Sequence, residues 1–305
     1  MCWLHCNRRI PTDRIKSRGQ DRGNSMREKP GRWRHGQGKA GAMFAAAMAV
    51  LLTLLAVAAS VAIYPEATGD AVYQSGGATV DASNIDQGYV MVKMSSSKKL
   101  KVRITGDEQY TYDLAGDGEY DVYPLQNGNR EYTLVVYEQV KGNSYSQVLS
   151  RTLRPQMADE NAPFLGPNCY TWYTADSAVV QLGNELCAGL TTDQEKVNAV
   201  YQYVTSNYIY DYMTAMMVSA GQQSGYVPDI DDMLETKMGI CFDFSALMGA
   251  LLRSQGIPTQ MVMGYADITY HAWNNILLDG EWVRYDATSA VTFTQISQYT
   301  EEAVY

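Results

Sequence analysis

The segment with the clearest pattern, residues 271–288, reads HAWNNILLDGEWVRYDAT. Its centre, Asp279-Gly280, is a strong signal for a two-residue hairpin turn, and the residues on both sides have strand character. Such a turn pairs positions whose numbers sum to 559, so Trp273 faces Asp286 and His271 faces Thr288. His271 and Asp286 are then diagonal neighbours on one face, with Cβ atoms about 7–8 Å apart. The hairpin therefore predicts a histidine within hydrogen-bonding reach of a carboxylate.

A cysteine stands at the start of the helical segment that precedes this hairpin. Gly239-Ile240-Cys241 leads into apolar positions spaced as on one face of a helix, and Gly256 and Pro258 mark the end of that helix. Free N–H groups and the positive end of the dipole at a helix N-terminus favour a thiolate. Cys241, His271 and Asp286 are therefore candidates for a nucleophile, its general base and the group that orients the base.

These residues resemble the transglutaminase-like superfamily. Its core has a Gly-x-Cys at a helix start, a His-Ala-Trp strand and a Trp-x-x-x-Asp-x-Thr strand, which occur here in that order at 239–241, 271–273 and 282–288. Supporting matches are Asn207-Tyr208-Ile209-Tyr210-Asp211, Gly256-Ile257-Pro258 and Gly264-Tyr265. The resemblance covers roughly residues 192–290. It implies a papain-like α+β fold in which the helix of the nucleophile packs on an antiparallel sheet.

The resemblance also implies a reaction. Cys241 would attack a carboxamide or peptide carbonyl, His271 would act as base and then as acid, and Asp286 would orient His271. The thioester would be resolved by water in a peptidase or amidase, or by an amine in a cross-linking transglutaminase. We expect hydrolysis rather than amine transfer. The oxyanion would be held by the backbone N–H of Cys241 and by Tyr210, for which packing at a helix end is the alternative.

No metal and no cofactor are expected. His271 is the only histidine after residue 35, so no Cys/His spacing suggests zinc. Larger members of the superfamily use calcium, and Asp229, Asp231 and Asp232 could suggest such a site. They lack an EF-hand pattern, and capping a short helix that starts at Met233 is the simpler interpretation.

The segments upstream of Cys241 carry fewer signals. Thr192-Asp193-Gln194-Glu195 has capping-box spacing and predicts a helix over about 193–206. Residues 213–226 predict an irregular loop or broken helix, whose methionines would either line a substrate cleft or pack locally. Cys169 and Cys187 could form a disulfide or remain two unpaired buried cysteines. Asp243 is expected to favour the helix dipole, without a catalytic role.

Residues 66–154 predict a β-rich domain, and residues 155–305 the catalytic domain. Short segments with alternating apolar residues lie between residues 89 and 153, separated by turn-forming clusters, which is typical of an all-β sandwich or small barrel. The tyrosines of this region could form a surface that contacts polymers or sugars. Cross-strand packing on a spacer domain is the simpler interpretation.

The N-terminal part predicts a membrane segment within residues 40–65. Residues 42–63 form a 22-residue apolar run, which is long enough to span a bilayer. The preceding residues 1–39 are basic and would stay in the cytoplasm. The run is either a signal-anchor or a cleaved signal peptide. We therefore expect a cell-membrane protein whose C-terminal region is extracytoplasmic, or a secreted protein; Met26 could also be the true start.

The charge distribution limits the partners. Residues 1–39 hold 11 Lys or Arg and 3 Asp or Glu, a net charge of +8, so the total of −9 leaves −17 in residues 40–305. An acidic body repels phosphate backbones, and no nucleic-acid partner is expected. The expected partners are a protein or peptide substrate, which could be associated with the cell surface or cell wall, and the membrane. The competing function is a catalytically inactive surface-binding protein whose core and β domain recognise peptide or cell-wall polymer.

Overall fold

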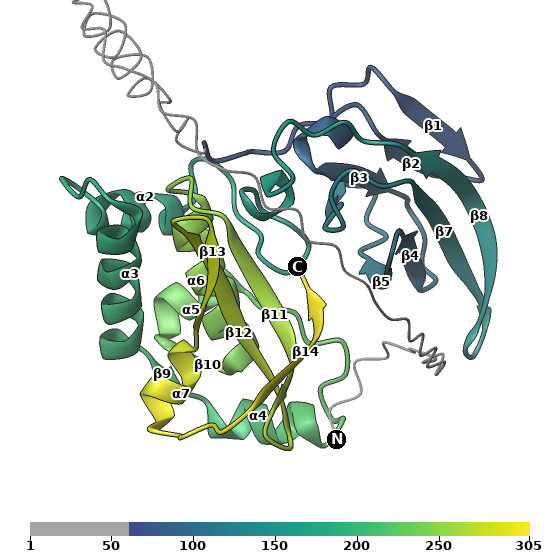
Figure 1. The fold of residues 1–305 in the computed structure, drawn as a ribbon. Helices are drawn as coiled ribbons and strands as arrows, with labels where there is room; N and C mark the ends of the chain where they lie inside the picture. Colours follow the sequence, from purple (N-terminus) through teal and green to yellow (C-terminus); the bar gives the residue numbers. More distant parts are fainter. Residues whose placement is uncertain (1–60) are drawn as a thin grey trace, which may run out of the picture. The chain divides into compact units, whose positions relative to one another are not determined.

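The computed structural model describes residues 61–305, which fall within one compact unit (Figure 1). The predicted basic segment, 1–39, lies outside the described residues, as does the predicted apolar span except for residues 61–63. These three residues are not helical, and the N–H of Ile63 donates to the carbonyl oxygen of Leu165 at 3.1 Å. In the part of the chain that is described, no helix is both long enough and apolar enough to cross a membrane.

Two four-stranded antiparallel sheets form the first region, as the alternating pattern predicts. One sheet has the order β1-β2-β3-β6, with strands Val72–Ser75, Ala78–Asp81, Tyr89–Lys93 and Asp121–Pro124. The other has the order β5-β4-β7-β8, with strands Gln109–Leu114, Leu100–Thr105, Tyr132–Lys141 and Ser144–Leu153. A short 3-10 helix, η1 (Ile85–Gln87), precedes β3. Buried residues of both sheets belong to one apolar cluster, so a β-rich region preceding the core is confirmed.

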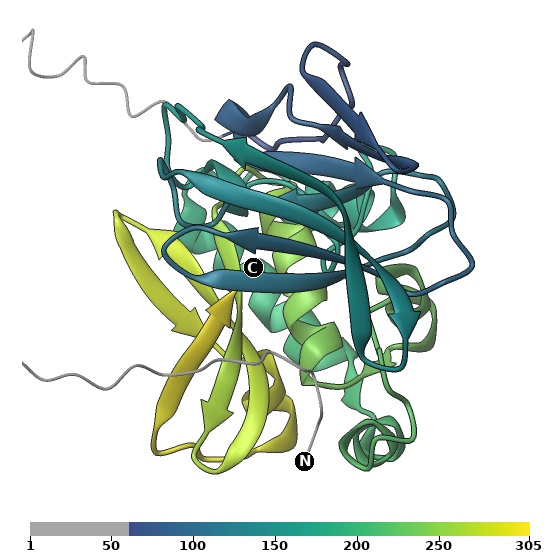
Figure 2. The ribbon, with the colours of Figure 1, turned by 90° about the vertical axis from the view of Figure 1, so that its right-hand side faces the viewer.

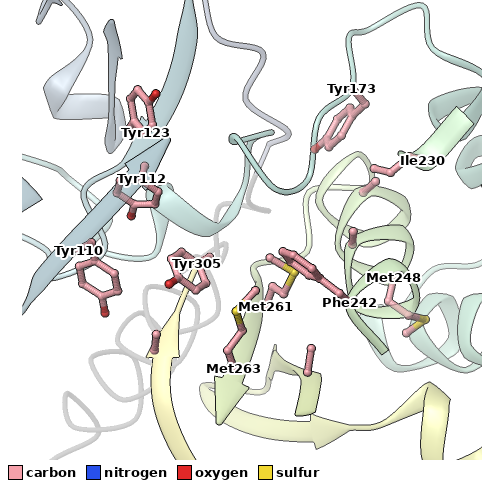
Figure 3. Packing of buried hydrophobic residues seen from close by; sticks show 14 of the residues in the cluster. Tyr110, Tyr112, Tyr123, Tyr173, Ile230, Phe242, Met248, Met261, Met263 and Tyr305 are labelled. Carbon is pink, nitrogen blue, oxygen red and sulfur yellow. The ribbon is translucent and has the colours of Figure 1, made fainter. Parts of the chain in front are cut away.

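The tyrosines of this region are mostly buried. Tyr110, Tyr112, Tyr123 and Tyr132 are each at most 3% exposed. The rings of Tyr112 and Tyr123 lie 5.0 Å apart between centroids (Figure 3). These four side chains therefore pack inside the region, and a contact surface for polymers cannot be built from them.

The second region is an α+β core. Its helices are the 3-10 helix η2 (Ala162–Phe164), α2 (Ala178–Leu186), α3 (Asp193–Asn207), α4 (Tyr212–Ser219), α5 (Ile230–Thr236), α6 (Cys241–Arg253) and α7 (Ala287–Thr292). Its antiparallel sheet has the order β13-β12-β11-β14, with strands Glu281–Tyr285, Thr269–Leu278, Thr259–Ala266 and Tyr299–Val304. A parallel pair joins β9 (Ile209–Tyr210) to β10 (Met238–Gly239).

Helix α6 is the centre of this core and packs against β11 and β12 (Figure 2). Every residue of α6 after Cys241 is buried, which is typical of a helix enclosed by its own domain. Only the first residue, Cys241, reaches the surface partly. The all-round burial fixes the position of the helix and therefore of the cysteine at its tip.

The local signals upstream of α6 are largely confirmed. Helix α3 begins after the capping box of Thr192 and Glu195, as predicted. The 213–226 segment is a broken helix, with α4 followed by turns. Helix α5 begins at Ile230, earlier than the expected Met233, because Asp229 caps it and accepts the N–H of Asp232 at 3.0 Å.

The disulfide considered for Cys169 and Cys187 is not formed, since both cysteines are free. The N–H of Cys169 donates to Val122 of strand β6 at 3.0 Å, whereas Cys187 ends helix α2 in the core. The two cysteines therefore contact different elements: Cys169 contacts β6, and Cys187 lies at the end of α2.

An alanine in place of Gly264 tests the packing of the sheet edge. A Cβ at Gly264 would overlap the backbone carbonyl of Thr300 in β14, at the point where the β11–β14 register shifts. We expect Gly264→Ala to lower the free energy of unfolding by about 1–3 kcal/mol, because backbone cannot yield as a flexible side chain does. Urea denaturation measures this change.

Gly249→Ala in helix α6 is the matched control. A Cβ at Gly249 would lie 3.4 Å from Cγ2 of Thr171, an ordinary contact. Alanine also stabilises a helix interior relative to glycine by about 0.5–1 kcal/mol. Equal stabilities of the two variants would contradict the close approach of β14 to β11.

Candidate active site

The local structure around Cys241 explains the Gly-x-Cys motif. Asp243 folds back over the start of α6, and its Oδ2 accepts the N–H of Ile240 at 2.8 Å. A Cβ on Gly239 would lie 2.7 Å from the Cβ of Asp243, so only glycine fits there. Cys241 is the first residue of the helix, and its N–H therefore has no intrahelical acceptor. The sulfur and the N–H of Cys241 therefore both lie at the N-terminal end of α6.

The hairpin register follows the prediction up to the end of strand β13. Asn274 pairs with Tyr285 and Leu278 with Glu281, so that the numbers sum to 559. The pairing then stops, because Asp286 becomes the N-cap of helix α7 and its Oδ1 accepts the N–H of Ser289 at 2.9 Å. The expected pairings of Trp273 with Asp286 and of His271 with Thr288 are therefore wrong, because Asp286 caps α7 and Thr288 lies in it.

The predicted contact between His271 and Asp286 is present. Nε2 of His271 lies 2.8 Å from Oδ2 of Asp286, and the two residues are 9% and 7% exposed. Because Nε2 is engaged by the carboxylate, Nδ1 is the ring atom that remains for Cys241. The sequence-predicted residues Cys241, His271 and Asp286 are therefore brought together.

The charges of Cys241, His271 and Asp286 stabilise one another. Burial by itself lowers the pKa of His271, but hydrogen bonds to Asp286 and Cys241 and the negative charge of both groups outweigh burial and raise it. Burial raises the pKa of Asp286, but the hydrogen bond and positive charge of His271 outweigh this effect and lower it. The geometry thus favours an imidazolium between a carboxylate and a cysteine sulfur at neutral pH.

Two aromatic residues complete the surroundings of Asp286 and His271. The hydroxyl of Tyr299, in β14, donates to Oδ2 of Asp286 at 2.8 Å. The ring of Trp273 is stacked on His271 at 6.2 Å and meets Tyr299 edge-on at 5.0 Å. Trp273 packs within the sheet, next to the imidazole. Tyr299 was not predicted, since no local motif marks a residue that reaches the site through strand pairing.

Tyr210, the candidate oxyanion donor, lies beside the nucleophile. Strand β9 pairs with β10 so that Tyr210 is opposite Gly239, two residues before Cys241. The side chain is half-buried, and its pKa is raised first by burial and then by negative charge on Cys241. Its hydroxyl is therefore within electrostatic reach of the sulfur, and a role as donor stays a prediction.

Asp243 was expected only to favour the helix dipole, but it does more. It is 3% exposed, and the Tyr226 hydroxyl donates to its Oδ2 at 2.7 Å. The carboxylate therefore ties the turn that follows α4 to the start of α6. Tyr226 carries no sequence signal of this contact.

A cavity of about 360 Å³ opens beside Cys241 and His271. One wall comes from α4 and the turn after it, and the other from the start of α6 and from β11 and β12. The lining residues are Tyr210, Ala215, Val218, Ser219, Gly221, Gln223, Ser224, Gly225, Tyr226, Ile240, Cys241, Phe242, Met263, Thr269, Tyr270, His271 and Ala272. The cysteine and histidine are thus accessible to a ligand of the size of a few residues.

The three aspartates considered as a calcium site do not line the cavity. Asp229, Asp231 and Asp232 occupy the N-cap and first turn of α5. Among the residues that the structure describes, no group of three or more His, Cys, Asp or Glu side chains is arranged to hold a metal ion.

The fold and site define an α+β protein with a cysteine, a histidine and an aspartate at one cavity. Residues 180–287 match the model of the transglutaminase-like superfamily, and this part of the chain is a transglutaminase-like core. The assignment made from the three motifs is therefore confirmed.

Two curated relatives align with the chain. YebA of Bacillus subtilis, an uncharacterised protein, is 26% identical over 245 residues, which cover 67% of this chain and 33% of YebA. Kyphoscoliosis peptidase of Homo sapiens is 27% identical over 141 residues, 42% of this chain and 21% of that protein. The chain thus spans about a third or less of the length of these relatives.

Solved structures show more distant similarity. A proposed cysteine protease from Cytophaga hutchinsonii has 18% identity and a TM-score of 0.40, covering 77% of this chain and 78% of its own. A TGase has 21% identity and a TM-score of 0.32, and the match covers 39% of this chain and 32% of the TGase chain.

The raised pKa of Asp243 predicts how the stability of the protein depends on pH. Burial raises this pKa to about 6, against the lowering effect of the hydrogen bonds from Ile240 and Tyr226. The folded state then holds the proton more tightly than the unfolded state, so stability falls as the pH rises from about 4 to about 6. At about 1.4 kcal/mol per pKa unit, Asp243→Asn should gain up to about 3 kcal/mol over the wild type across this interval.

Urea unfolding of both proteins between pH 4 and pH 8 measures this difference. Subtracting the two curves removes the other acidic groups and any constant effect of the substitution. A difference that does not change with pH would show that Asp243 ionises as easily in the folded state as in the unfolded chain.

Proposed function

We propose that the protein is a thiol enzyme that cleaves peptide or carboxamide bonds through a thioester on Cys241. One observation carries the proposal: Cys241 stands at the tip of a buried helix, faces a cavity and lies beside a histidine that Asp286 holds at 2.8 Å. This arrangement supplies a nucleophile, a proton carrier and the group that orients the carrier.

The geometry suggests the order of steps. The sulfur of Cys241 attacks the carbonyl carbon, and the negative oxygen that forms is stabilised by the N–H of Cys241 and the hydroxyl of Tyr210. His271 donates its Nδ1 proton to the departing amine as the C–N bond breaks. Water then loses a proton to His271 and attacks the thioester, which returns the Cys241 thiolate and the free acid. Asp286 keeps Nε2 protonated throughout.

Hydrolysis is favoured over transfer to an amine. The name of one relative, kyphoscoliosis peptidase, supports a hydrolytic function for a core of this kind. The substrate is proposed to be a protein or peptide, and the site to be extracytoplasmic, on the cell membrane or secreted. The residues that would anchor or export the chain lie outside the described part.

Removal of His271 is the first test. Without the imidazole the cysteine loses its charge partner, so His271→Ala should slow alkylation of Cys241 by limiting iodoacetamide at neutral pH by at least about tenfold. Intact mass and peptide mapping measure the rate and the position of the label.

The other cysteines and a second histidine serve as controls. Cys187 is buried and should react slowly in both proteins. His35→Ala, a loss of histidine outside the described residues, should leave the rate at Cys241 unchanged. Slow labelling of Cys241 that is indifferent to His271 would contradict catalysis and favour an inactive binding protein.

A labelled primary amine separates hydrolysis from transfer. With a protein substrate and excess amine, we expect new carboxylates or N-termini and no incorporated label, and Cys241→Ala should abolish both products. Incorporation of the amine that depends on Cys241 would show instead that the acyl-enzyme is resolved by amines, with water kept out of the site. Mass spectrometry of the substrate distinguishes the two results.

A further inference from the structure

We propose that the cavity beside Cys241 is a specificity pocket for an uncharged, largely apolar side chain of the acyl donor. The inference rests on the proposed function, because it names the substrate class of the same site. It follows from the chemistry of the cavity wall, from the state of the nearby carboxylate and from the size of the cavity.

The wall offers no carboxylate, ammonium or guanidinium group to a charged side chain. Among the described residues that line the cavity there is no Asp, Glu, Lys or Arg; apart from tyrosines, only Cys241 and His271 can ionise. Ala215 and Val218 of α4 form part of one side, and Phe242 and Met263 part of the other. His271 and Cys241 are engaged with each other, so a charged side chain would lose hydration there without a further charged group to pair with. An apolar side chain would be stabilised by its burial.

The carboxylate of Asp243, the residue after the lining residue Phe242, is already satisfied. Oδ2 of Asp243 accepts both the Tyr226 hydroxyl at 2.7 Å and the N–H of Ile240 at 2.8 Å. Tyr226 lines the cavity while its hydroxyl is engaged by Asp243. A cationic side chain in the cavity would therefore find the Asp243 carboxylate already engaged by these two donors.

The size of the cavity fits a side chain with some adjoining backbone. Its volume of about 360 Å³ lies at the lower end of the range for ligand pockets, about 300–1,000 Å³. Cys241 is part of its lining, so the residue bound there is close to the carbonyl that the sulfur attacks.

Peptidyl acyloxymethyl ketones test the proposal without knowledge of the natural substrate. The Cys241 sulfur displaces the acyloxy group as a carboxylate and forms a thioether, so labelling reports binding next to the sulfur. Two matched pairs differ in charge at the residue beside the ketone: norleucine against lysine, and glutamine against glutamate. We expect the neutral member of each pair to label the full-length protein at least about tenfold faster, with norleucine the fastest.

A new carboxylate in the wall should reverse the first preference. Helix α4 has no fully buried residue, and Ala215 is half-buried beside the cavity, which leaves room for the carboxylate of Ala215→Asp. In this variant the lysine probe should react faster than the norleucine probe, a gain that misfolding cannot produce. Met213→Asp is the matched control, since Met213 lies on the same helix but is 61% exposed and outside the lining, and it should leave the ratio unchanged.

The outcomes are distinct. Equal rates for charged and neutral probes, with rapid iodoacetamide labelling that depends on His271, would overturn the pocket and leave the proposed function standing. The same holds if Ala215→Asp does not move the norleucine-to-lysine ratio. If no reagent labels Cys241 in a manner that depends on His271, both the function and the pocket are overturned.

Discussion

The carboxylate of Asp286 joins more separate parts of the core than any other group at the site. Its Oδ1 caps helix α7 by accepting the N–H of Ser289, while Oδ2 holds His271 of β12 and accepts the hydroxyl of Tyr299 of β14. The residue stands where β13 ends, so the same position stops the sheet, starts a helix and fixes the imidazole. Charge makes this possible, because an ionised carboxylate accepts several strong hydrogen bonds at once. The orientation of His271 toward Cys241 depends on that anchoring.

A second buried carboxylate, Asp243, has a pKa that its surroundings shift in the direction opposite to that of Asp286. Asp286 faces a cation, which outweighs burial and lowers its pKa. Asp243 faces only a tyrosine hydroxyl and a backbone N–H, so burial dominates and raises its pKa to about 6. The surroundings therefore shift the two pKa values in opposite directions, and only Asp286 lies against the imidazole that it stabilises. Asp243 shapes the start of α6 and the cavity wall.

Local signals in the sequence predicted the elements that carry the nucleophile and the base. Asp279-Gly280 set the register of β12 and β13, and the glycine before Cys241 marked the start of α6, because turn and helix-end chemistry depends on a few neighbouring residues. The register failed at Asp286, where the side chain caps a helix instead of continuing the strand. Tyr299 and Tyr226 could not be predicted, since both reach their carboxylates through long-range folding of segments with no distinctive motif. Whether Cys169 and Cys187 form a disulfide could not be predicted either, because the answer depends on their positions in three dimensions.

Strand β14 shows why the β-rich region bears on the site although it contributes no residue to the cavity. One end of β14 carries Tyr299, which contacts Asp286. At the other end, the side chain of Gln126 from the β-rich region donates to the carbonyl oxygen of Val304 at 3.2 Å, and the ring of Tyr305 lies 6.0 Å from that of Tyr112 (Figure 3). Tyr170, 4.9 Å from Tyr305, also packs on Phe242, the residue after Cys241. The aromatic cluster thus contacts both the end of β14, the strand of Tyr299, and α6, the helix that begins with Cys241. Because buried aromatic contacts resist displacement, the β-rich region stabilises the relative positions of these two elements.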